Sequence, residues 1–426
     1  MTAKELLAAL EAGTYDSNLS ALYSAKDVNA QRSRYLEAVK QFAERYGEER
    51  EVSVFTVAGR SEISGNHTDH NLGCVIAASI NLDIIAVASK RDDTVIHVKS
   101  EGFPEDVIDY REDSILPKNY FSSGAIITGV CRGFLDRKHR VCGFDAFTTS
   151  NVLKGSGLSS SAAFEDMIGT ILNWFSNGGK IGFTEIAQIS QFAENKYFGK
   201  PCGLMDQVAC AAGGFVSIDF ADPKQPVVEK FDFNLTGKGY ALCIVNTGGN
   251  HADLNEDYAS VPAEMKQVAA YFGEPVLRPV TMDQLIPAIP DLRKSCGDRA
   301  ILRAIHYIRE NQLVMEQMKA LKSGDMKRFL QNEIASGDSS FKYLQNVYTT
   351  KNVSEQGLSL ALALSQTYLA DKEGAWRVHG GGFAGTTQAF VRTEDVEGYR
   401  AIMNSVFGEG ACIVLQVRST GAGKVI

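Results

Sequence analysis

The sequence predicts an α+β fold made of two halves, and three observations indicate it. Strand-like and helix-like segments alternate from the start of the chain to about residue 222. The hydrophobic spacing is then mainly helical from about residue 253 to residue 370, and the remainder returns to a strand–helix–strand pattern. With 426 residues, the chain can form two or three domains of about 150 residues, each with its own core.

The first expected elements surround a polar loop. Residues 30–46 are predicted to be a helix because their apolar side chains, among them Val39 and Phe42, share one stripe. Residues 51–58 alternate in the manner of a largely buried strand, and a polar loop follows over 59–73. The next expected strands are 75–80, 84–89 and 94–99.

A strand over 144–151 runs into a glycine-rich loop, and a helix over 162–175 follows. Proline and charge cluster at Asp222-Pro223-Lys224, so we expect an N-terminal domain over 1–222 and a C-terminal domain over 223–426. The other expected helices are 183–198, 204–212, 253–272, 297–322, 325–345, 354–370 and 395–406. The other expected strands are 214–220, 239–246, 386–393 and 411–417.

Composition excludes several classes of protein. Lys and Arg number 43 against 51 Asp and Glu, a net charge of −8, and no basic run indicates a nucleic-acid partner. The eight cysteines include no C-x-x-C pair, which favours reduced thiols. The longest apolar stretch, 75–89, is broken by Asn81 and Asp83, and no signal peptide is evident. We therefore expect a cytoplasmic protein without a membrane partner; the oligomeric state is left open, a monomer being compatible.

The segment Lys154-Gly-Ser-Gly-Leu-Ser-Ser-Ser161 is the first that could carry chemistry. Its glycines allow close approach of a ligand to the backbone, and the following helix N-terminus is suited to phosphate. It is neither a Walker A loop nor a dinucleotide fingerprint, because Ser160 stands where the third glycine would be. A serine-rich helix cap with a glycine turn is the alternative reading.

The segment Gly380-Gly-Gly-Phe-Ala-Gly385 matches G-x-G-x-x-G, but its context differs from that of a dinucleotide site. A dinucleotide loop opens a helix, whereas residues 386–391 are typical of a strand. The local sequence therefore favours a tight turn between two strands.

The polar loop Gly59–Gly73 is dense in side chains that form hydrogen bonds. His67, Asp69 and His70 fit the end of the metal-ligand run H-x-H-x-D-H, although Gly65 replaces its first histidine. The alternative is a sugar site, in which Asn, Asp and His side chains bond to vicinal hydroxyls.

In this order, the segments resemble the GHMP family of small-molecule kinases, and most closely its galactokinases. Gly59–Asp69 is similar to the signature G-R-x-x-x-x-G-E-H-T-D-Y, and Gly155–Ala162 is similar to the family's phosphate loop. Three further resemblances are Val378–Gly385 to the third family motif, Cys202–Gln207 to the segment with the catalytic Asp, and Asn246–Tyr258, with His251, to a stretch that supplies a sugar-contacting Tyr.

The resemblance implies a fold and a reaction. The fold would be a two-domain GHMP-kinase-like α+β fold, with an S5-like α/β domain, a ferredoxin-like C-terminal half and the active site in the cleft between them. The reaction would be transfer of the γ-phosphate of ATP, with Mg²⁺, to the anomeric hydroxyl of galactose.

The resemblance also implies residue roles. Asp206 would be the base and Arg60 the cation near the transferred phosphate, while Ser161 and Glu194 would hold Mg²⁺. The sugar would face Asn66, His67, Thr68, Asp69 and Tyr258. The nucleotide would contact Gly155, Ser156, Gly157, Leu158, Ser159, Ser160, Ser161 and Ser100.

Two positions depart from the family pattern, since Asn66 stands for the usual Glu and His70 for the usual Tyr. Loss of a carboxylate would remove repulsion of a sugar acid. Galactose stays the preferred substrate. The alternatives are galacturonate or another C6-modified galactose, then a non-catalytic sugar sensor, then a metal-dependent hydrolase.

Overall fold

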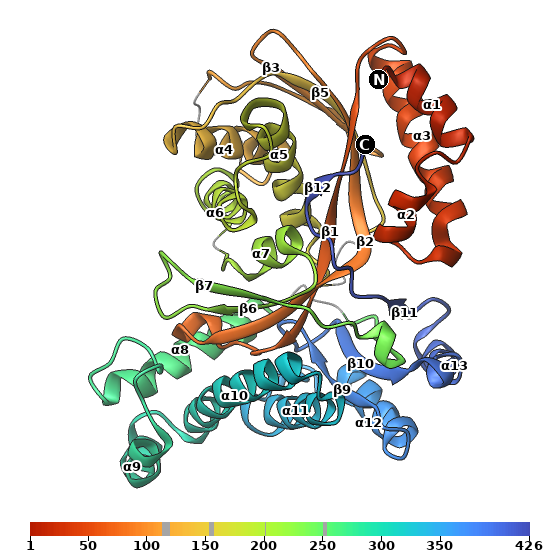
Figure 1. Ribbon diagram of the computed structural model, residues 1–426. Helices are drawn as coiled ribbons and strands as arrows, with labels where there is room; N and C mark the ends of the chain where they lie inside the picture. The colour runs from red at the N-terminus through yellow and green to blue at the C-terminus, as the bar shows by residue number, and fades with distance from the viewer. Residues whose placement is uncertain (113–119, 153–156, 201, 250–253) are drawn as a thin grey trace.

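The computed structural model describes residues 1–112, 120–152, 157–200, 202–249 and 254–426. Within these ranges, eight strands form one sheet, with the order β12-β1-β2-β5-β3-β4 and with β6 and β7 attached to β2 (Figure 1). Their bounds are β1 Ser53–Ser64, β2 Cys74–Lys90, β3 Val95–Ser100, β4 Glu105–Asp109, β5 Phe144–Ser150, β6 Phe215–Asp219, β7 Val227–Phe231 and β12 Gly423–Lys424.

Helices cover both faces of this first sheet (Figure 1). Alternate residues of the strands face opposite sides, so Val54 packs against the N-terminal helices and Phe55 against the other set. A sheet covered on both faces favours nearly continuous apolar strands, as β2 is over most of its length, whereas β1 is buried although it includes Arg60 and Glu62. The N-terminal helices are α1 Ala3–Glu11, α2 Asp16–Leu22 and α3 Val28–Tyr46. The others are α4 Ser123–Asp136, α5 Ser160–Asn177, α6 Phe183–Ala193 and α7 Met205–Ala212.

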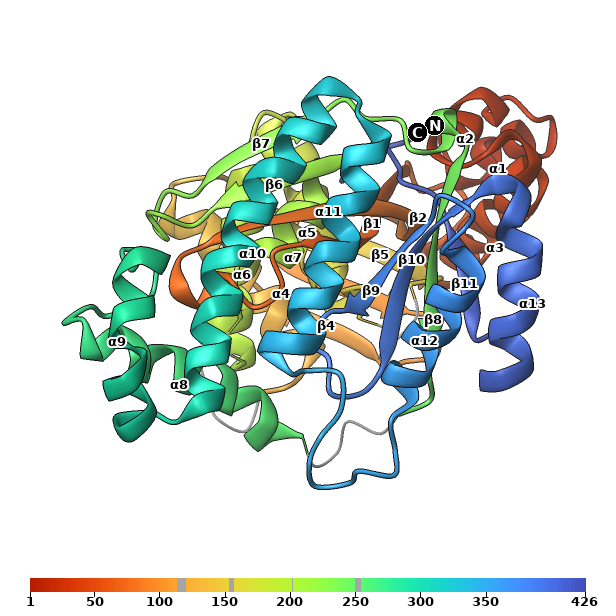
Figure 2. The same cartoon turned by 90° about the horizontal axis from the view of Figure 1, so that it is seen from below.

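The described C-terminal residues form a four-stranded antiparallel sheet in the order β11-β8-β10-β9. Helices α12 and α13 pack on one face and α10 and α11 on the other (Figure 2). The strands are β8 Tyr240–Asn246, β9 Ala375–His379, β10 Thr386–Arg392 and β11 Cys412–Leu415. The helices are α8 Asn255–Tyr271, α9 Met282–Ser295, α10 Asp298–Ser323, α11 Met326–Ser339, α12 Gly357–Leu369 and α13 Val396–Phe407.

The two halves share one apolar core. Phe215 of the first sheet and Phe390 of the second both pack on Phe329 of α11, with ring centroids 6.2 Å and 4.9 Å from it. Residues of α8, α9 and the start of α10 form a separate cluster beside this core. The halves are therefore joined by a continuous interior, and the α+β expectation is confirmed.

The sheet pairing shows where the chain passes from the first sheet to the second, and the predicted domain boundary at residue 222 stays a prediction. Strands β6 and β7 pair from Phe215↔Phe231 to Asp219↔Val227 and belong to the first sheet, so residue 222 lies inside their hairpin. The chain changes sheet only after Phe231. It also returns near its end, since Phe55 of β1 pairs with Lys424 of β12.

Two expected strands, 75–80 and 84–89, are one strand, β2. We expected a break because Asn81 and Asp83 are polar, but both are satisfied inside the fold. Asn81 exchanges hydrogen bonds with the Gln416 backbone, and Asp83 pairs with Arg34 at 2.6 Å and Arg418 at 2.7 Å. The first half of β2 can therefore pair with β6 and the second with β5.

Strand β1 extends to Ser64 and so includes the first residues of the expected polar loop. Arg60 and Glu62 are consequently strand residues in a fixed register with β2. The glycine segment 380–385 is a turn between the antiparallel strands β9 and β10, as its local sequence indicated. The helices and strands whose bounds were not predicted from the sequence are α1, α2, α4, α9, β4, β7, β9 and β12.

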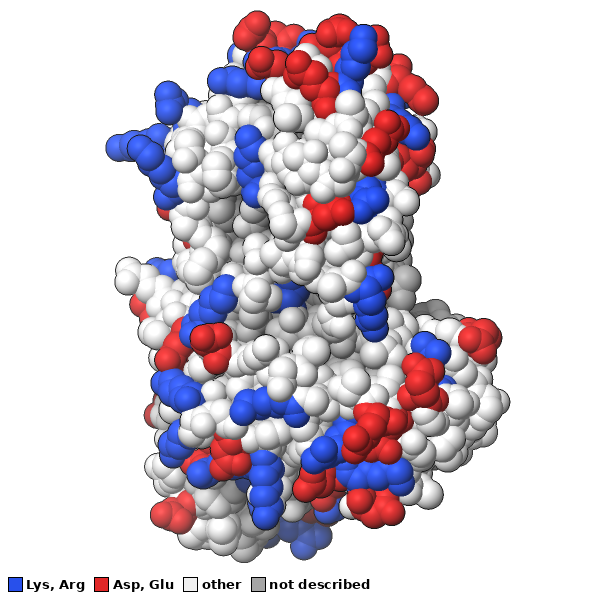
Figure 3. All heavy atoms as spheres, turned by 45° about the vertical axis from the view of Figure 1, so that its right-hand side comes forward, with Lys and Arg blue, Asp and Glu red and all other residues white. Residues whose placement is uncertain are grey.

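The surface agrees with the composition. On the face shown in Figure 3, Lys and Arg are interspersed with Asp and Glu, and no continuous basic band crosses it. None of the helices in the described ranges is long and apolar enough to cross a membrane.

Candidate active site

Arg60 and Asp206 meet between β1 and the first turn of α7. The guanidinium lies with Nε 2.9 Å and Nη2 2.8 Å from the same carboxylate oxygen, Oδ1 of Asp206. Arg60 is buried, whereas about a third of the Asp206 side chain is exposed. The carboxylate is therefore held from the protein side and open on the other.

The glycine-rich loop reaches this pair from the opposite side. Arg60 donates through its backbone N–H to the carbonyl of Leu158 at 3.1 Å and through Nη1 to the carbonyl of Gly157. Ser159 donates to Oδ2 of Asp206 at 2.6 Å. Ser160 and Ser161 then open α5, while Gly155 and Ser156 lie outside the described residues. The structure thus brings the expected phosphate loop onto the expected catalytic pair.

The surroundings of Asp206 favour its ionised form. Burial alone would raise its pKa, but the charge of Arg60 and the hydrogen bonds from Ser159 and Arg60 outweigh burial. The pKa of Asp206 therefore lies below its ordinary value, with a further contribution from Lys200. This carboxylate is available as a proton acceptor at neutral pH.

Glu194 lies behind this pair, at the end of α6, and its side chain is 3% exposed. Its two oxygens have separate donors: Lys200 Nζ lies 3.1 Å from Oε1, and Gln207 Nε2 donates to Oε2 at 2.9 Å. The same Gln207 nitrogen donates to Glu165 at 3.0 Å, and burial raises the pKa of Glu165 well above its ordinary value. Two acidic side chains therefore share one amide next to Asp206.

The expected magnesium ligands fit that ion by chemistry. A carboxylate at Glu194 and a hydroxyl at Ser161, which is exposed at the start of α5, are the hard oxygen ligands that Mg²⁺ prefers. No group of three His, Cys, Asp or Glu suited to a metal occurs in the described part of the chain. Mg²⁺ sites of phosphate-transfer enzymes use one or two carboxylates plus substrate phosphates and water. The described residues give no ligand set to the metal-dependent hydrolase alternative.

Asn66 is 1% exposed, and its side-chain amide bonds within the protein. Nδ2 donates to Glu62 at 2.9 Å and to the Gly380 carbonyl at 2.7 Å, while Oδ1 accepts from Asn346 at 2.8 Å. Burial raises the pKa of Glu62, although Arg377 and Asn66 act in the opposite sense. Asn66 therefore ties the loop to the C-terminal half.

Carbonyl groups of the turn between β9 and β10 contact two further residues of the expected sugar site, His67 and Tyr258. The carbonyl of Gly381 lies 2.9 Å from Nε2 of His67, and the carbonyl of Gly382 accepts from the Tyr258 hydroxyl at 2.8 Å. Burial lowers the pKa of His67 to about 4, so its ring is neutral near pH 7. The glycines suit this turn because Cβ atoms at 381 and 382 would lie 2.7 Å from the Tyr258 ring and 2.0 Å from the Asn346 carbonyl.

The other expected sugar residues differ in position. Thr68 is buried and donates to the carbonyls of Gly65 and Cys74, so it shapes the loop. Asp69 is partly exposed and lines a cavity of about 390 Å³ together with residues 202–204, just before Asp206. The structure thus places Asp69 where a small molecule can reach it.

Ser100 ends β3 and accepts from Thr148 of the neighbouring strand β5 at 2.9 Å. Strand β5 precedes the phosphate loop in the sequence, and the contact of Ser100 with a nucleotide stays a prediction.

The roles of three residues near the site were not predicted from the sequence: those of Gln207 and Lys200, which contact Glu194, and that of His379. His379 ends β9 and forms hydrogen bonds with Ser61 of β1 and Thr386 of β10. Burial lowers the pKa of His379 to about 3.

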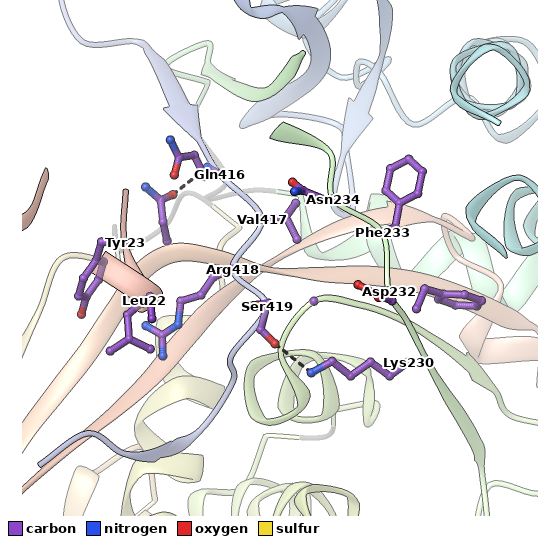
Figure 4. Close-up of a pocket in the computed structure, with 14 residues that line it drawn as sticks. Leu22, Tyr23, Lys230, Asp232, Phe233, Asn234, Gln416, Val417, Arg418 and Ser419 are labelled. Carbon is purple, nitrogen blue, oxygen red and sulfur yellow. Dashed lines mark hydrogen bonds between the residues drawn. The ribbon is translucent and has the colours of Figure 1, made fainter. Parts of the chain in front are cut away.

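A second cavity, of about 610 Å³, lies away from these residues. It is formed where α2, the end of β7 and the segment 416–419 meet (Figure 4). Lys230 crosses one side and donates to the carbonyls of Ala212 and Ser419, each at 2.9 Å. None of the expected catalytic, sugar or nucleotide residues lines it.

Comparison with known proteins agrees with this arrangement. Residues 125–214 match the family model of the GHMP kinase N-terminal domain, and residues 40–90 match that of the galactokinase galactose-binding signature. The solved structure of Lactococcus lactis galactokinase complexed with galactose has a TM-score of 0.71 at 24% identity and covers 91% of this chain and 99% of that one. Mevalonate kinase of Methanococcus jannaschii has a TM-score of 0.60 at 13% identity, covering 86% and 98%.

Together, the fold and the loop–Arg–Asp arrangement define a small-molecule kinase of the GHMP class. The galactokinase of Actinobacillus pleuropneumoniae serotype 5b is 32% identical over 371 residues, which are 86% of this chain and 92% of that protein. That of Streptomyces coelicolor is 29% identical and covers 91% and 97%. The chain belongs to the galactokinase family.

Proposed function

We propose that this protein is an ATP-dependent galactose 1-kinase that uses Mg²⁺ and forms galactose 1-phosphate and ADP. The observation that carries the proposal is the contact of Asp206 with both Arg60 and Ser159 of the phosphate loop. A base, a fixed cation and a phosphate-binding helix start are thereby within one small volume. Phosphoryl transfer depends on such positioning and charge compensation more than on covalent chemistry.

Asp206 orients the anomeric hydroxyl and accepts its proton during transfer. Its lowered pKa keeps it ionised, and its open side leaves room for the sugar. A positioned general base contributes about 10²–10⁴ in rate. Because Arg60 and Ser159 occupy its two oxygens from the protein side, the carboxylate is restricted to one orientation.

Arg60 and the start of α5 hold the phosphates. A guanidinium stays charged at any working pH, and Arg60 is fixed by the carbonyl of Gly157 and by Asp206. The first N–H groups of α5 carry partial positive charge toward the same region. Ser161 and Glu194 would hold Mg²⁺, which when bound neutralises charge on the phosphate oxygens.

The sugar is bound by the loop that follows β1. Asp69, which lines the 390 Å³ cavity, supplies acceptors for sugar hydroxyls. His67 of the same loop and Tyr258 of α8 both contact carbonyls of the glycine turn between β9 and β10. Asn66 and Thr68 act by shaping the loop. Since the Asn66 amide is engaged within the protein, the argument for a C6-carboxylated substrate has no support, and galactose is the substrate we propose.

The test is release of ADP, measured with a coupled assay against galactose, galacturonate, glucose and other hexoses. We expect galactose to give the highest kcat/KM and Asp206→Asn to abolish most of it. Absence of sugar-dependent ADP release in a protein that binds galactose would instead support the sugar-sensor alternative.

The eight cysteines are free thiols, which supports a reducing, cytoplasmic location.

A further inference from the structure

Lys200 lies beside Glu194, the expected metal ligand. The segment Glu194–Phe198 is a wide helical turn in which the N–H groups of Gly199 and Lys200 both donate to the Glu194 carbonyl. Gly199 has a φ of 85°, a left-handed conformation that folds the chain back. The Lys200 side chain is thereby returned over the carboxylate of Glu194, with Nζ 3.1 Å from Oε1.

The charges around Glu194 explain why a cation is needed there. A buried carboxylate is costly unless it is paired, and Glu194 is only 3% exposed. Arg60 is committed to Asp206, and Gln207 is neutral. Lys200 is therefore the cation that the structure pairs with Glu194.

The ammonium of Lys200 is also placed to change partners. The Lys200 side chain is 56% exposed, whereas the Glu194 side chain is buried. Lys200 can therefore move away from Glu194 without disturbing the interior. Its charge also reaches Asp206, the carboxylate at which transfer takes place in the proposed function. A divalent ion arriving with ATP would supply the charge that Glu194 needs, and the phosphates would supply a new partner for the ammonium.

We propose that Lys200 is a stand-in cation: it neutralises Glu194 while the metal is absent, and it pairs with the nucleotide phosphates once the metal occupies that carboxylate. This inference rests on the proposed function. It predicts that Lys200 weakens the binding of free metal and strengthens the binding of the metal–ATP complex. Opposite effects of one side chain are not expected of a residue that only maintains the fold.

The test uses the full chain with Lys200→Met, which keeps the length of the side chain and removes its charge. Mn²⁺ binding without nucleotide is measured by electron paramagnetic resonance, and KM for Mg·ATP is measured in the galactose assay. We expect Mn²⁺ to bind about fivefold more tightly, as loss of a pair of roughly 1 kcal/mol implies. We expect KM for Mg·ATP to rise about fivefold.

Matched variants make the result decisive. Lys196→Met, at another exposed lysine of the same turn, should leave both quantities unchanged, and Lys200→Arg should stay near the wild type in both. Glu194→Gln should weaken Mn²⁺ binding at least about tenfold. The proposal is overturned if Lys200→Met alters neither quantity, if both move in the same direction, or if Glu194→Gln binds Mn²⁺ as the wild type does. The Mn²⁺ measurement needs no turnover, so failure of the galactokinase activity itself would be seen separately.

Discussion

Ser159 donates a 2.6 Å hydrogen bond to Oδ2 of Asp206, the oxygen that Arg60 leaves uncovered. The contact joins the phosphate loop directly to the proposed base. The position of the base is therefore coupled to the conformation of the loop that receives ATP.

Removal of this hydroxyl should shift the pH dependence of the reaction. The hydrogen bond from Ser159 lowers the pKa of Asp206, so Ser159→Ala raises that pKa and protonates the base at higher pH. The acid limb of kcat/KM should move up by about 1 pH unit, as expected for one hydrogen bond to a charged group. Ser159 has a φ of 59°, so Ser159→Gly, which relieves the backbone, serves as a second variant. An acid limb that stays in place in both would exclude the coupling.

Asp206→Asn retains the shape of the side chain and removes the proton acceptor. We expect kcat to fall by about 10²–10⁴ while the dissociation constant for ATP changes less than about threefold. Single-turnover kinetics and nucleotide titration measure the two quantities. Asp222→Asn, at an exposed position, is the control. Near-normal turnover of Asp206→Asn would show that another group accepts the proton.

Gly157→Val should weaken ATP binding. Gly157 has a φ of 71°, which a β-branched residue adopts only with strain, and its carbonyl accepts from Arg60. We expect ATP affinity to fall at least about tenfold, measured by calorimetry. Gly178→Val is the control because Gly178 has a φ of 65° at the far end of α5, with similar strain and no contact with the loop. An equal loss of ATP affinity in both variants would show that the loss comes from a destabilised fold, not from the phosphate loop.

Asn66→Glu should destabilise the protein, because the new carboxylate would lie beside the buried Glu62. Asn66 Nδ2 is now 2.9 Å from Glu62, and repulsion in its place would cost roughly 2–4 kcal/mol in the free energy of unfolding. The loss should be larger at pH 8 than at pH 5, because at low pH one of the two carboxyls retains its proton. Urea unfolding at both pH values measures it.

The double variant Glu62→Asn with Asn66→Glu is the matched control for this pair. It restores one amide and one carboxylate and should recover at least half of the lost stability. If Asn66→Glu is as stable as the wild type and galactose is replaced by another preferred sugar, Asn66 faces the substrate after all.

The sequence allowed the fold class, the family and the main loops to be predicted, because each depends on local pattern. The phosphate loop is recognisable from its glycines and serines, and the β9–β10 turn from the strand-like residues after it. Helix α5 and strands β5 and β8 lie within two residues of their expected bounds, since their apolar spacing is regular.

The contacts of Asn66 could not be predicted, because its partners come from distant parts of the chain. Glu62 is four residues away, but Asn346 and Gly380 belong to the other half. Local sequence shows only a polar residue in a polar loop. Only the meeting of the two halves turns that amide inward.

The continuity of β2 was missed for a related reason. Asp83 looked like an interruption because its partners are distant in the sequence: Arg34 lies 49 residues before it in α3, and Arg418 lies 335 residues after it. Helix α9 was missed because Pro287 and Pro290 within it ordinarily argue against a helix. In both cases tertiary contacts override a local preference.

The return of the segment 416–426 to the first sheet has a consequence for how the protein is made. Strand β12, which pairs with β1, and Arg418, which pairs with Asp83, leave the ribosome long after residues Ser53–Lys90. The N-terminal half is therefore synthesised with one edge of β1 unpaired and with Asp83 paired to Arg34 but not yet to Arg418. Such an edge can associate with other chains during translation, so the yield of native protein should depend on how quickly the last residues are added.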